Sequence, residues 1–236
     1  MVSKMTRKKQ RIPRIAILAS GGGSTAEAFI HATQDGRVAA EVVLIVCSNP
    51  PEKAGVFERV RKLNALYHLN IQITMINAAT HPGGKAERGQ TDEESAAICT
   101  MIDASDITHV ALMGYMRIVR GELAERYGWQ PHFSSIYQAR MSNTHPGSLP
   151  ETEDTYGIHT QEKVLAMGLP SSKHTFHLVA AGIDRGPIIA EHPVEVMPND
   201  TPQDLFDRVQ LVEKTYLPGA INKFLIDQER YVHSNS

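Results

Sequence analysis

The first half of the chain alternates short apolar runs with segments of helical periodicity. Four runs predict strands and the three segments between them predict helices, in the order 15–19, 24–33, 42–47, 53–68, 71–76, 91–104 and 110–113. Because the strand-like runs are almost entirely apolar, both faces of each strand must be covered, as in a parallel sheet with helices on both sides. The pattern therefore predicts a doubly wound α/β unit.

The second half of the chain is less regular. Three further strand-like runs lie at 135–141, 175–179 and 188–196. The last two are separated by the tight-turn sequence 184–187, and two strands this close along the chain favour an antiparallel addition to the sheet.

A long helix is predicted at the C-terminal end. Thr201 is expected to be its N-cap and Pro202 its first residue, whereas Pro218 should end or kink it. The predicted fold is thus a doubly wound, Rossmann-like α/β fold. Its sheet is mostly parallel, with an antiparallel C-terminal addition and a long C-terminal helix.

One domain is expected to account for most of the 236 residues, since a chain of this length can bury a full core. Residues 1–12 are basic and predict a disordered leader. Residues 13–228 predict a single domain with an N-terminal half, 13–114, and a second half, 115–228, followed by a tail at 229–236.

The composition narrows the range of partners. With 24 basic and 26 acidic side chains, the chain gives no reason to expect nucleic acid or a membrane surface as a partner. No secretory signal or apolar span is recognisable, and two cysteines are too few for a disulfide framework, so a cytoplasmic protein is expected. His174 and His177 should face opposite sides of a strand, and His159 has no partner at ligand spacing, so no metal is expected.

Three glycines, 21–23, follow the first predicted strand. Gly21, Gly23 and Ala26 fit a dinucleotide-binding turn, whereas Ser24 and Glu27 fit a helix capping box. Both interpretations leave backbone N–H groups at a helix start, where a phosphate binds well. A dinucleotide fold also needs an acidic residue at the end of the second strand; the sequence there, 48–51, is Ser-Asn-Pro-Pro, which weakens that alternative.

The chemistry-bearing residues come after the run 135–141. Asn143 and His145 are two residues apart, so in an extended chain both side chains project from one face. An amide donor beside an imidazole is suited to acyl transfer, although a strand that ends in a turn with a surface histidine would look the same. Asp184 is either a turn residue bonded to its own backbone or a carboxylate that orients His145, and only its distance from His145 separates the two.

Six motifs, in the same order along the chain, resemble those of the folate-dependent formyltransferases. They lie at 20–24, 114–119, 143–150, 157–160, 184–189 and 208–213, and the resemblance covers about residues 13–226. It implies transfer of a formyl group from the co-substrate 10-formyltetrahydrofolate to the amine of glycinamide ribonucleotide, a step of de novo purine biosynthesis. It also implies small-molecule partners only, no metal, and a monomer or homodimer.

The resemblance assigns roles to particular residues. Asn143 would bind the formyl oxygen as the tetrahedral centre forms, His145 would stabilise that oxyanion and assist proton movement, and Asp184 would hold His145 and a water. The substrate phosphate and ribose would be bound by Gly23, Ser24, Thr25, Gln210 and Glu213. The folate would be bound by Met116, Arg117, Ile118, Val119, Ala180, Ala181, Gly182 and Ile183, although Met116 and Ile118 are also typical core residues.

Some positions depart from the family pattern. Gly22 and Thr25 stand where asparagines are usual, Ala96 stands near a usual arginine, and the loop 78–90 looks longer, either as a lid or as a plain loop. Residues 151–155 also form an acidic stretch, at a place where members of the family often have a neutral or basic one. The departures leave open formylation of another phosphorylated amine.

Other activities are alternatives to formyl transfer onto this amine. Formyltetrahydrofolate hydrolase shares the three chemical residues but usually has an additional domain, as does methionyl-tRNA formyltransferase. A nucleotide-binding protein that has lost turnover is the non-enzyme alternative, and it would not need Asn143, His145 and Asp184 together.

Overall fold

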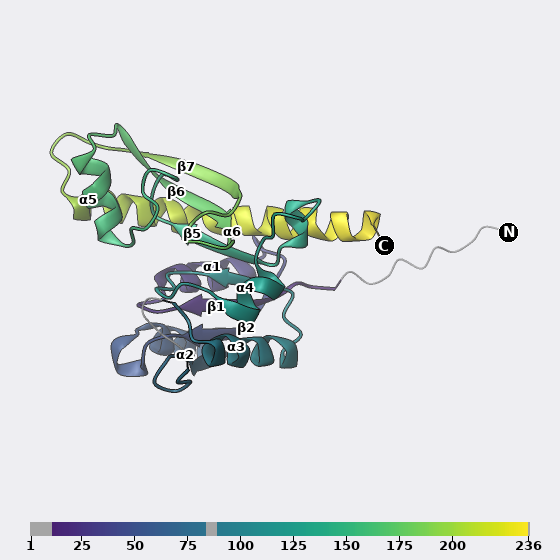
Figure 1. Ribbon diagram of the computed structural model, residues 1–236. Helices are drawn as coiled ribbons and strands as arrows, with labels where there is room; N and C mark the ends of the chain where they lie inside the picture. The colour runs from purple at the N-terminus through teal and green to yellow at the C-terminus, as the bar shows by residue number, and fades with distance from the viewer. Residues whose placement is uncertain (1–10, 84–88, 236) are drawn as a thin grey trace.

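A seven-stranded sheet organises the molecule (Figure 1). The computed structural model describes residues 11–83 and 89–235. The strand order is β3-β2-β1-β4-β5-β6-β7, with parallel pairing from β3 to β5 and antiparallel pairing of β5 with β6 and of β6 with β7. The strands are β1 Arg14–Ala19, β2 Glu41–Cys47, β3 Gln72–Met75, β4 His109–Leu112, β5 Met141–His145, β6 Ser171–Leu178 and β7 Ile188–Glu195. This confirms the predicted mostly parallel sheet with an antiparallel addition.

Helices cover both faces of the sheet. They are α1 Ser24–Gln34, α2 Val56–Tyr67, α3 Asp92–Ala104, α4 Gly121–Tyr127, α5 Ile158–Ala166 and α6 Pro202–Ser234, with short 3₁₀ turns at Pro51–Lys53 and Ile136–Gln138. Along β1, Ile15 and Ile17 pack towards α1, α2 and α6, whereas Ala16 and Leu18 pack towards α3 and α4. A two-sided strand of this kind can be apolar throughout, which explains the continuous runs in the sequence.

Two of the predicted helix starts are confirmed. The Thr91 hydroxyl accepts the N–H of Glu94 while the Glu94 carboxylate accepts the N–H of Thr91, which completes a capping box at α3. At α6, Thr201 is the N-cap, and Asp204 closes a second capping box.

The capping box predicted from Ser24 and Glu27 is wrong. The N-cap of α1 is Gly23, in the left-handed region at φ 75°, and among the described residues no side chain bonds to this cap. Glu27 instead forms an ion pair with Arg59 of α2, whose Nε also donates to the carbonyl of Gly22 at 2.8 Å. The long-range ion pair therefore replaces the local cap.

The strand predicted at 135–141 is also wrong. Ser135 caps a 3₁₀ turn whose partly buried Ile136 and Tyr137 pack against the core, and pairing with β4 begins only at Met141. The true strand is the polar segment Met141–His145, which hydrophobicity alone does not identify as a central strand.

Pro218 does not end the last helix. α6 continues from Pro202 to Ser234, so the predicted tail is helical over most of its length. Pro218 and its neighbour Leu217 are buried against the core together with Ile221, and this packing outweighs the local cost of a proline in a helix.

Two further expectations concern the ends of the chain and membranes. Most of the predicted leader, residues 1–10, lies outside the described residues, and Arg11 and Ile12 are exposed. None of the helices within 11–83 and 89–235 has the length and apolarity needed to cross a membrane.

Candidate active site

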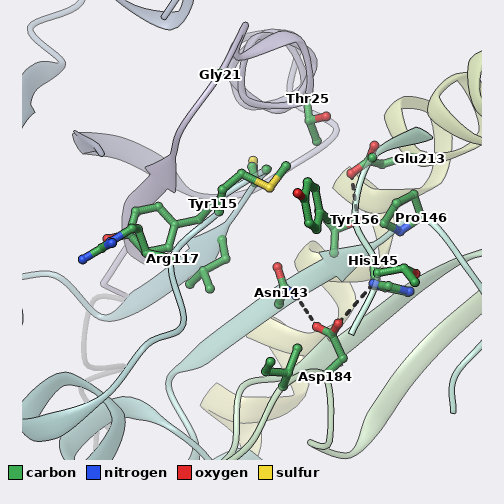
Figure 2. Close-up of a pocket in the computed structure, with 18 of the residues that line it drawn as sticks. Gly21, Thr25, Tyr115, Arg117, Asn143, His145, Pro146, Tyr156, Asp184 and Glu213 are labelled. Atoms are coloured by element: carbon green, nitrogen blue, oxygen red, sulfur yellow. Dashed lines mark hydrogen bonds and ion pairs between the residues drawn. The ribbon is translucent and has the colours of Figure 1, made fainter. Parts of the chain in front are cut away.

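A cavity of about 530 Å³ opens at the carboxyl ends of β1, β4 and β5 (Figure 2). The strand order reverses between β1 and β4, and crevices at such reversal points are where α/β sheets bind ligands. The lining includes every expected site residue except Ala181: Gly23, Ser24, Thr25, Met116, Arg117, Ile118, Val119, Asn143, His145, Ala180, Gly182, Ile183, Asp184, Gln210 and Glu213. Residues far apart in the sequence thus line one cavity.

The polar end of β5 forms the floor of the cavity. Asn143 and His145 project from the same face of the strand, as the spacing predicted (Figure 2). The His145 ring is 3% exposed, because β6 lies beside it in antiparallel register and the turn that follows β5 folds over it.

Asp184 reaches the same floor from the turn after β6. Its backbone adopts a left-handed φ of 52°, and its carboxylate lies between the two β5 residues. The Nδ2 group of Asn143 donates to Oδ1 at 3.1 Å, and Nδ1 of His145 is 3.3 Å from Oδ2. Asp184 thus lies close enough to His145 for its carboxylate to orient the imidazole ring.

The charge of Asp184 is stabilised by its neighbours. Burial raises the pKa of the Asp184 carboxyl, but hydrogen bonding and charge interactions with His145 and His177 outweigh it and leave the pKa well below its ordinary value. The site therefore contains a fixed negative charge next to an imidazole at neutral pH.

His177 belongs to the site and was not expected from the sequence. It stands opposite Asn143 in the β5–β6 register, and its Nε2 accepts from Nδ2 of Asn143 at 3.1 Å while its Nδ1 donates to the carbonyl of Leu178 at 2.8 Å. Nε2 also lies 3.4 Å from Oδ1 of Asp184. The only signal for His177 in the sequence is that it lies in a predicted strand shortly before Asp184. A histidine of the core could stand in the same place, so this signal does not identify a site residue.

The far side of the His145 ring contacts a residue from the acidic stretch. Nε2 of His145 is 2.9 Å from the hydroxyl oxygen of Thr152, and that hydroxyl donates to the carbonyl of Ser148 at 2.7 Å. Thr152 is fully buried. Both ring nitrogens of His145 are therefore engaged.

Glu213 lines the cavity from α6 and is nearly buried, at 9% exposure. The Thr144 hydroxyl donates to its Oε1 at 2.8 Å, and Thr144 in turn accepts from Nε2 of His174 at 2.9 Å. Burial raises the pKa of the Glu213 carboxyl, opposed by hydrogen bonds with Thr144 and Thr25. Burial also lowers the pKa of His174 to about 3, so this histidine is neutral at physiological pH.

The glycine turn forms one end of the cavity. Gly23 precedes α1, whose first N–H groups have no partner within the helix and face the same end as Thr25. A Cβ at Gly23 would lie 2.6 Å from Cγ2 of Val56, so the close approach of α2 requires glycine here. The Arg59 side chain of α2 also stabilises the turn, because its Nε donates to the Gly22 carbonyl.

The opposite end of the cavity is largely apolar. Met116 is 52% exposed at the mouth, and the lining there includes Leu112, Val119, Val179 and Ile183. The Arg117 side chain points away from the polar floor of the cavity (Figure 2). Its guanidinium instead donates to the carboxylate of the fully buried Glu94 at 2.7 Å. Arg117 is thus held by the protein rather than left free for an anion.

A metal centre is not formed within the part of the chain that the structure describes. No group of three or more His, Cys, Asp or Glu side chains there is arranged to hold an ion. The histidines at the site instead bond to Asp184, Asn143 and Thr152.

Comparison with known proteins points to one family. A family model described as formyl transferase matches residues 13–221. The phosphoribosylglycinamide formyltransferase of Mycobacterium tuberculosis is 30% identical over 208 residues, which cover 88% of this chain and 83% of that protein. The enzyme of the same name from Bacillus subtilis is 27% identical over 212 residues, which cover 90% of this chain and 94% of that protein.

Solved structures agree with the sequence comparison. The phosphoribosylglycinamide formyltransferase of Bacillus halodurans has a TM-score of 0.73 at 29% identity and covers 90% of this chain and 95% of its own. Glycinamide ribonucleotide transformylase 1 of Symbiobacterium toebii has a TM-score of 0.74 at 28% identity, and the match covers 89% of this chain and 86% of that one.

Proposed function

The chain belongs to the formyl transferase family, and on that premise we propose that it transfers a formyl group from 10-formyltetrahydrofolate to the amine of glycinamide ribonucleotide. The reaction forms a bond between the amine nitrogen and the formyl carbon and breaks the bond between that carbon and N10 of the folate. The amine loses one proton and N10 gains one, so the balance needs no other reactant.

One observation carries the proposal. Asn143 and His145 each lie within hydrogen-bond distance of Asp184, on the floor of a cavity that has a helix start at one end and apolar walls at the other. A helix start suits a phosphate, and apolar walls suit a flat aromatic ring. The polar floor then lies between the two, where an amine and a formyl carbon would meet.

The contacts of His145 and Asp184 support a path for the proton. The nucleophilic amine must lose a proton as it adds to the formyl carbon, and Nδ1 of His145 is the imidazole atom next to Asp184. Asp184 remains ionised and stabilises the imidazolium that results. His145 then returns the proton towards the leaving nitrogen.

Asn143 stabilises the charge on the formyl oxygen. Both of its amide hydrogens are engaged, one by Asp184 and one by His177. To donate to the developing oxyanion, Asn143 exchanges its bond with His177 for one to the substrate and keeps its bond with Asp184. An amide donor of this kind typically contributes 10²- to 10³-fold, roughly, to the rate of acyl transfer.

The residues at the apolar end fit the pteridine of a folate. The segment 116–119 and the turn residues Ala180, Gly182 and Ile183 border this part of the cavity. They would bind the ring through apolar contact and backbone groups. Glu213, already oriented by Thr144 and Thr25, would accept hydrogen bonds from ribose hydroxyls, and Gln210 lies one helical turn away on the same lining.

We also place the reaction in the cytoplasm. Support comes from the cysteines, because both Cys47 and Cys99 are buried thiols rather than partners in a disulfide. An epitope-tagged protein should therefore fractionate with cytoplasmic markers, and recovery with a membrane or secreted fraction would refute this location.

The acceptor amine can be tested against a competitor. Gly22 and Thr25 line the phosphate end, so glycinamide ribonucleotide should be compared with other phosphorylated amines in the presence of 10-formyltetrahydrofolate. We expect deformylated folate to appear with glycinamide ribonucleotide at the highest kcat/KM. A folded protein that formylates only a different amine would overturn the acceptor, and one that releases formate without any amine would identify a hydrolase.

A variant tests the mechanism in the same assay. His145→Ala should reduce kcat by about 10²-fold or more, because general acid and base catalysis contributes at least that much. Folate binding, followed by fluorescence quenching, should change little since the pteridine end does not depend on this ring. An unchanged kcat would remove His145 from the mechanism.

A further inference from the structure

We propose that Arg59 of α2 is a positioning residue for the phosphate end of the cavity, because its bond to the Gly22 carbonyl directs the N–H of Gly23 towards a bound phosphate. Arg59 does not itself line the cavity. The inference rests on the proposed function for the identity of the substrate, a phosphorylated amine. Its structural content, the orientation of a peptide group, can be tested with inorganic phosphate alone.

The first turn of α2 holds two consecutive carbonyl groups of the glycine turn, residues 21–23. The Val56 N–H donates to the Gly21 carbonyl at 3.3 Å, and Nε of Arg59 donates to the Gly22 carbonyl at 2.8 Å. The two segments lie close together here, since a Cβ at Gly55 would be 3.4 Å from the Gly22 carbonyl oxygen. Both carbonyl groups therefore face α2.

The planarity of the peptide group determines where the N–H groups of the glycine turn point. Within the described residues the cis peptide bond is Leu149–Pro150, so both peptide groups of the glycine turn are trans. In a trans peptide the N–H points opposite to the C=O. The N–H groups of Gly22 and Gly23 therefore point away from α2.

These two N–H groups are available to a ligand. No hydrogen bond that the structure describes uses either of them, and Gly23 has a left-handed φ of 75°. Successive N–H groups next to a left-handed residue form the kind of concavity that binds anions. The cavity is lined by residues 21–25 and by none of the described residues of α2, so we place it on the side to which the N–H groups point.

Glu27 gives Arg59 a second task. Its carboxylate lies in the first turn of α1 and forms an ion pair with Nη1 of Arg59. The two side chains are partly shielded from solvent, at 39% exposure for Arg59 and 29% for Glu27. An unpaired carboxylate at this place would compete with a phosphate for the positive end of the helix. Arg59 thus orients the glycine turn through Nε and neutralises Glu27 through Nη1.

A guanidinium suits these two tasks better than an ammonium group. Its planar fork offers Nε and Nη1 to two acceptors at once, whereas the lysine ammonium is a point charge on a flexible stem. The glycines cannot fix the turn themselves, because they have no side chains. Among the described hydrogen bonds, the one from Arg59 is the side-chain bond to residues 21–23.

The test compares Arg59→Lys with a matched control on the same helix. Arg61 donates to both carboxylate oxygens of Glu58, at 2.8 and 2.6 Å, but this pair is exposed and has no described contact with the glycine turn. In Arg59→Lys the dissociation constant for inorganic phosphate, measured by calorimetry, should rise about tenfold, which corresponds to the loss of about one hydrogen bond. Arg61→Lys should bind phosphate like the unaltered protein.

Kinetics separate positioning from a general loss of stability. In Arg59→Lys the KM for glycinamide ribonucleotide should rise about tenfold while kcat stays unchanged, the signature of lost substrate binding. The KM for the folate should also stay unchanged, because the described side-chain bonds of Arg59 go to Gly22 and Glu27 and not to the apolar end. A merely structural role would instead lower the active fraction and so reduce the apparent kcat.

A double variant separates orientation from charge. Arg59→Met removes both contacts and leaves Glu27 unpaired, so phosphate affinity should fall further than in Arg59→Lys. Adding Glu27→Gln removes the unpaired charge without restoring the bond to Gly22, so the affinity should return only to the level of Arg59→Lys. Full recovery in the double variant would show that Arg59 only neutralises Glu27, and would overturn the inference.

Three further outcomes would also overturn it: unchanged phosphate affinity in Arg59→Lys, an equal loss in Arg61→Lys, or no phosphate binding by the unaltered protein. The proposed function fails in a different way. If phosphate binds as expected and depends on Arg59, but glycinamide ribonucleotide is not formylated, the proposed function is refuted and the role of Arg59 stands.

Discussion

Nδ2 of Asn143 lies 3.1 Å from Nε2 of His177, across the antiparallel pair β5 and β6. A central strand and the first antiparallel strand thus each contribute one member of a partly buried polar pair. The pair joins the parallel part of the fold to the antiparallel addition at the point where the chemistry is proposed.

Replacement of His177 should therefore disturb Asn143. His177→Phe keeps an aromatic ring but removes the acceptor, so one amide hydrogen of Asn143 loses its partner in a buried site. We expect kcat to fall by about tenfold and the free energy of unfolding to fall by roughly 1–3 kcal/mol. Steady-state kinetics and urea unfolding check this. His177→Gln, which retains an acceptor, should lose less of both, and equal losses in the two variants would contradict the role of the acceptor.

Asp184→Asn should lower kcat/KM by about 10²-fold or more, because the imidazolium of His145 loses its counter-charge. The pH dependence of stability gives a second measurement. The pKa of Asp184 is depressed in the folded protein, so its contribution to stability is present above the unfolded pKa, roughly 3.9, and is lost as pH falls through the folded value. The stability difference between the two proteins should thus shrink below about pH 4. A difference that grows there would contradict this sign.

Glu213→Gln should separate substrate binding from stability. The raised pKa of Glu213 means that the folded state binds its proton more tightly than the unfolded state, so this carboxylate costs stability at neutral pH. We expect the melting midpoint at pH 7.5 to rise by about 3 °C, the effect of roughly 1 kcal/mol in a domain of this size. The KM for glycinamide ribonucleotide should rise about tenfold while the KM for the folate stays unchanged. A rise in both KM values would place Glu213 outside the ribose site.

Gly23→Ala tests the phosphate end of the cavity. The residue has φ 75°, and its new Cβ would lie 2.6 Å from Cγ2 of Val56, so we expect a loss of roughly 1–3 kcal/mol of stability and weaker phosphate binding. Calorimetry with inorganic phosphate and thermal unfolding measure the two effects. Gly21→Ala is the matched control for stability, because its Cβ meets no atom within 4 Å. Equal destabilisation by both changes would contradict the steric argument.

Much of the fold could be predicted because it depends on periodicity. The buried parallel strands are apolar on both faces, and Thr91 and Thr201 act as caps through hydrogen bonds within four residues of sequence. Hydrophobicity does not predict strand β5, for the opposite reason. Its segment Met141–His145 is polar because it carries the site, so tertiary pairing rather than hydrophobicity makes it a strand.

The site was predictable only in part. The two-residue spacing placed Asn143 and His145 on one face, but the contributions of His177 and Thr152 depend on strand register and on the packing of the turn after β5. Neither appears in a local pattern. At α1 the local pattern was misleading, because Arg59, 32 residues beyond Glu27, takes the carboxylate that the capping box needed.

The central claim is that this cavity catalyses formyl transfer to glycinamide ribonucleotide. The most direct measurement mixes the purified protein with 10-formyltetrahydrofolate and glycinamide ribonucleotide, and follows the deformylated folate by absorbance and the formylated ribonucleotide by mass spectrometry. We predict that both products appear in equal amounts, at a rate that His145→Ala reduces by about 10²-fold or more. No formylated ribonucleotide from folded protein, or product at an undiminished rate in the variant, would contradict the account.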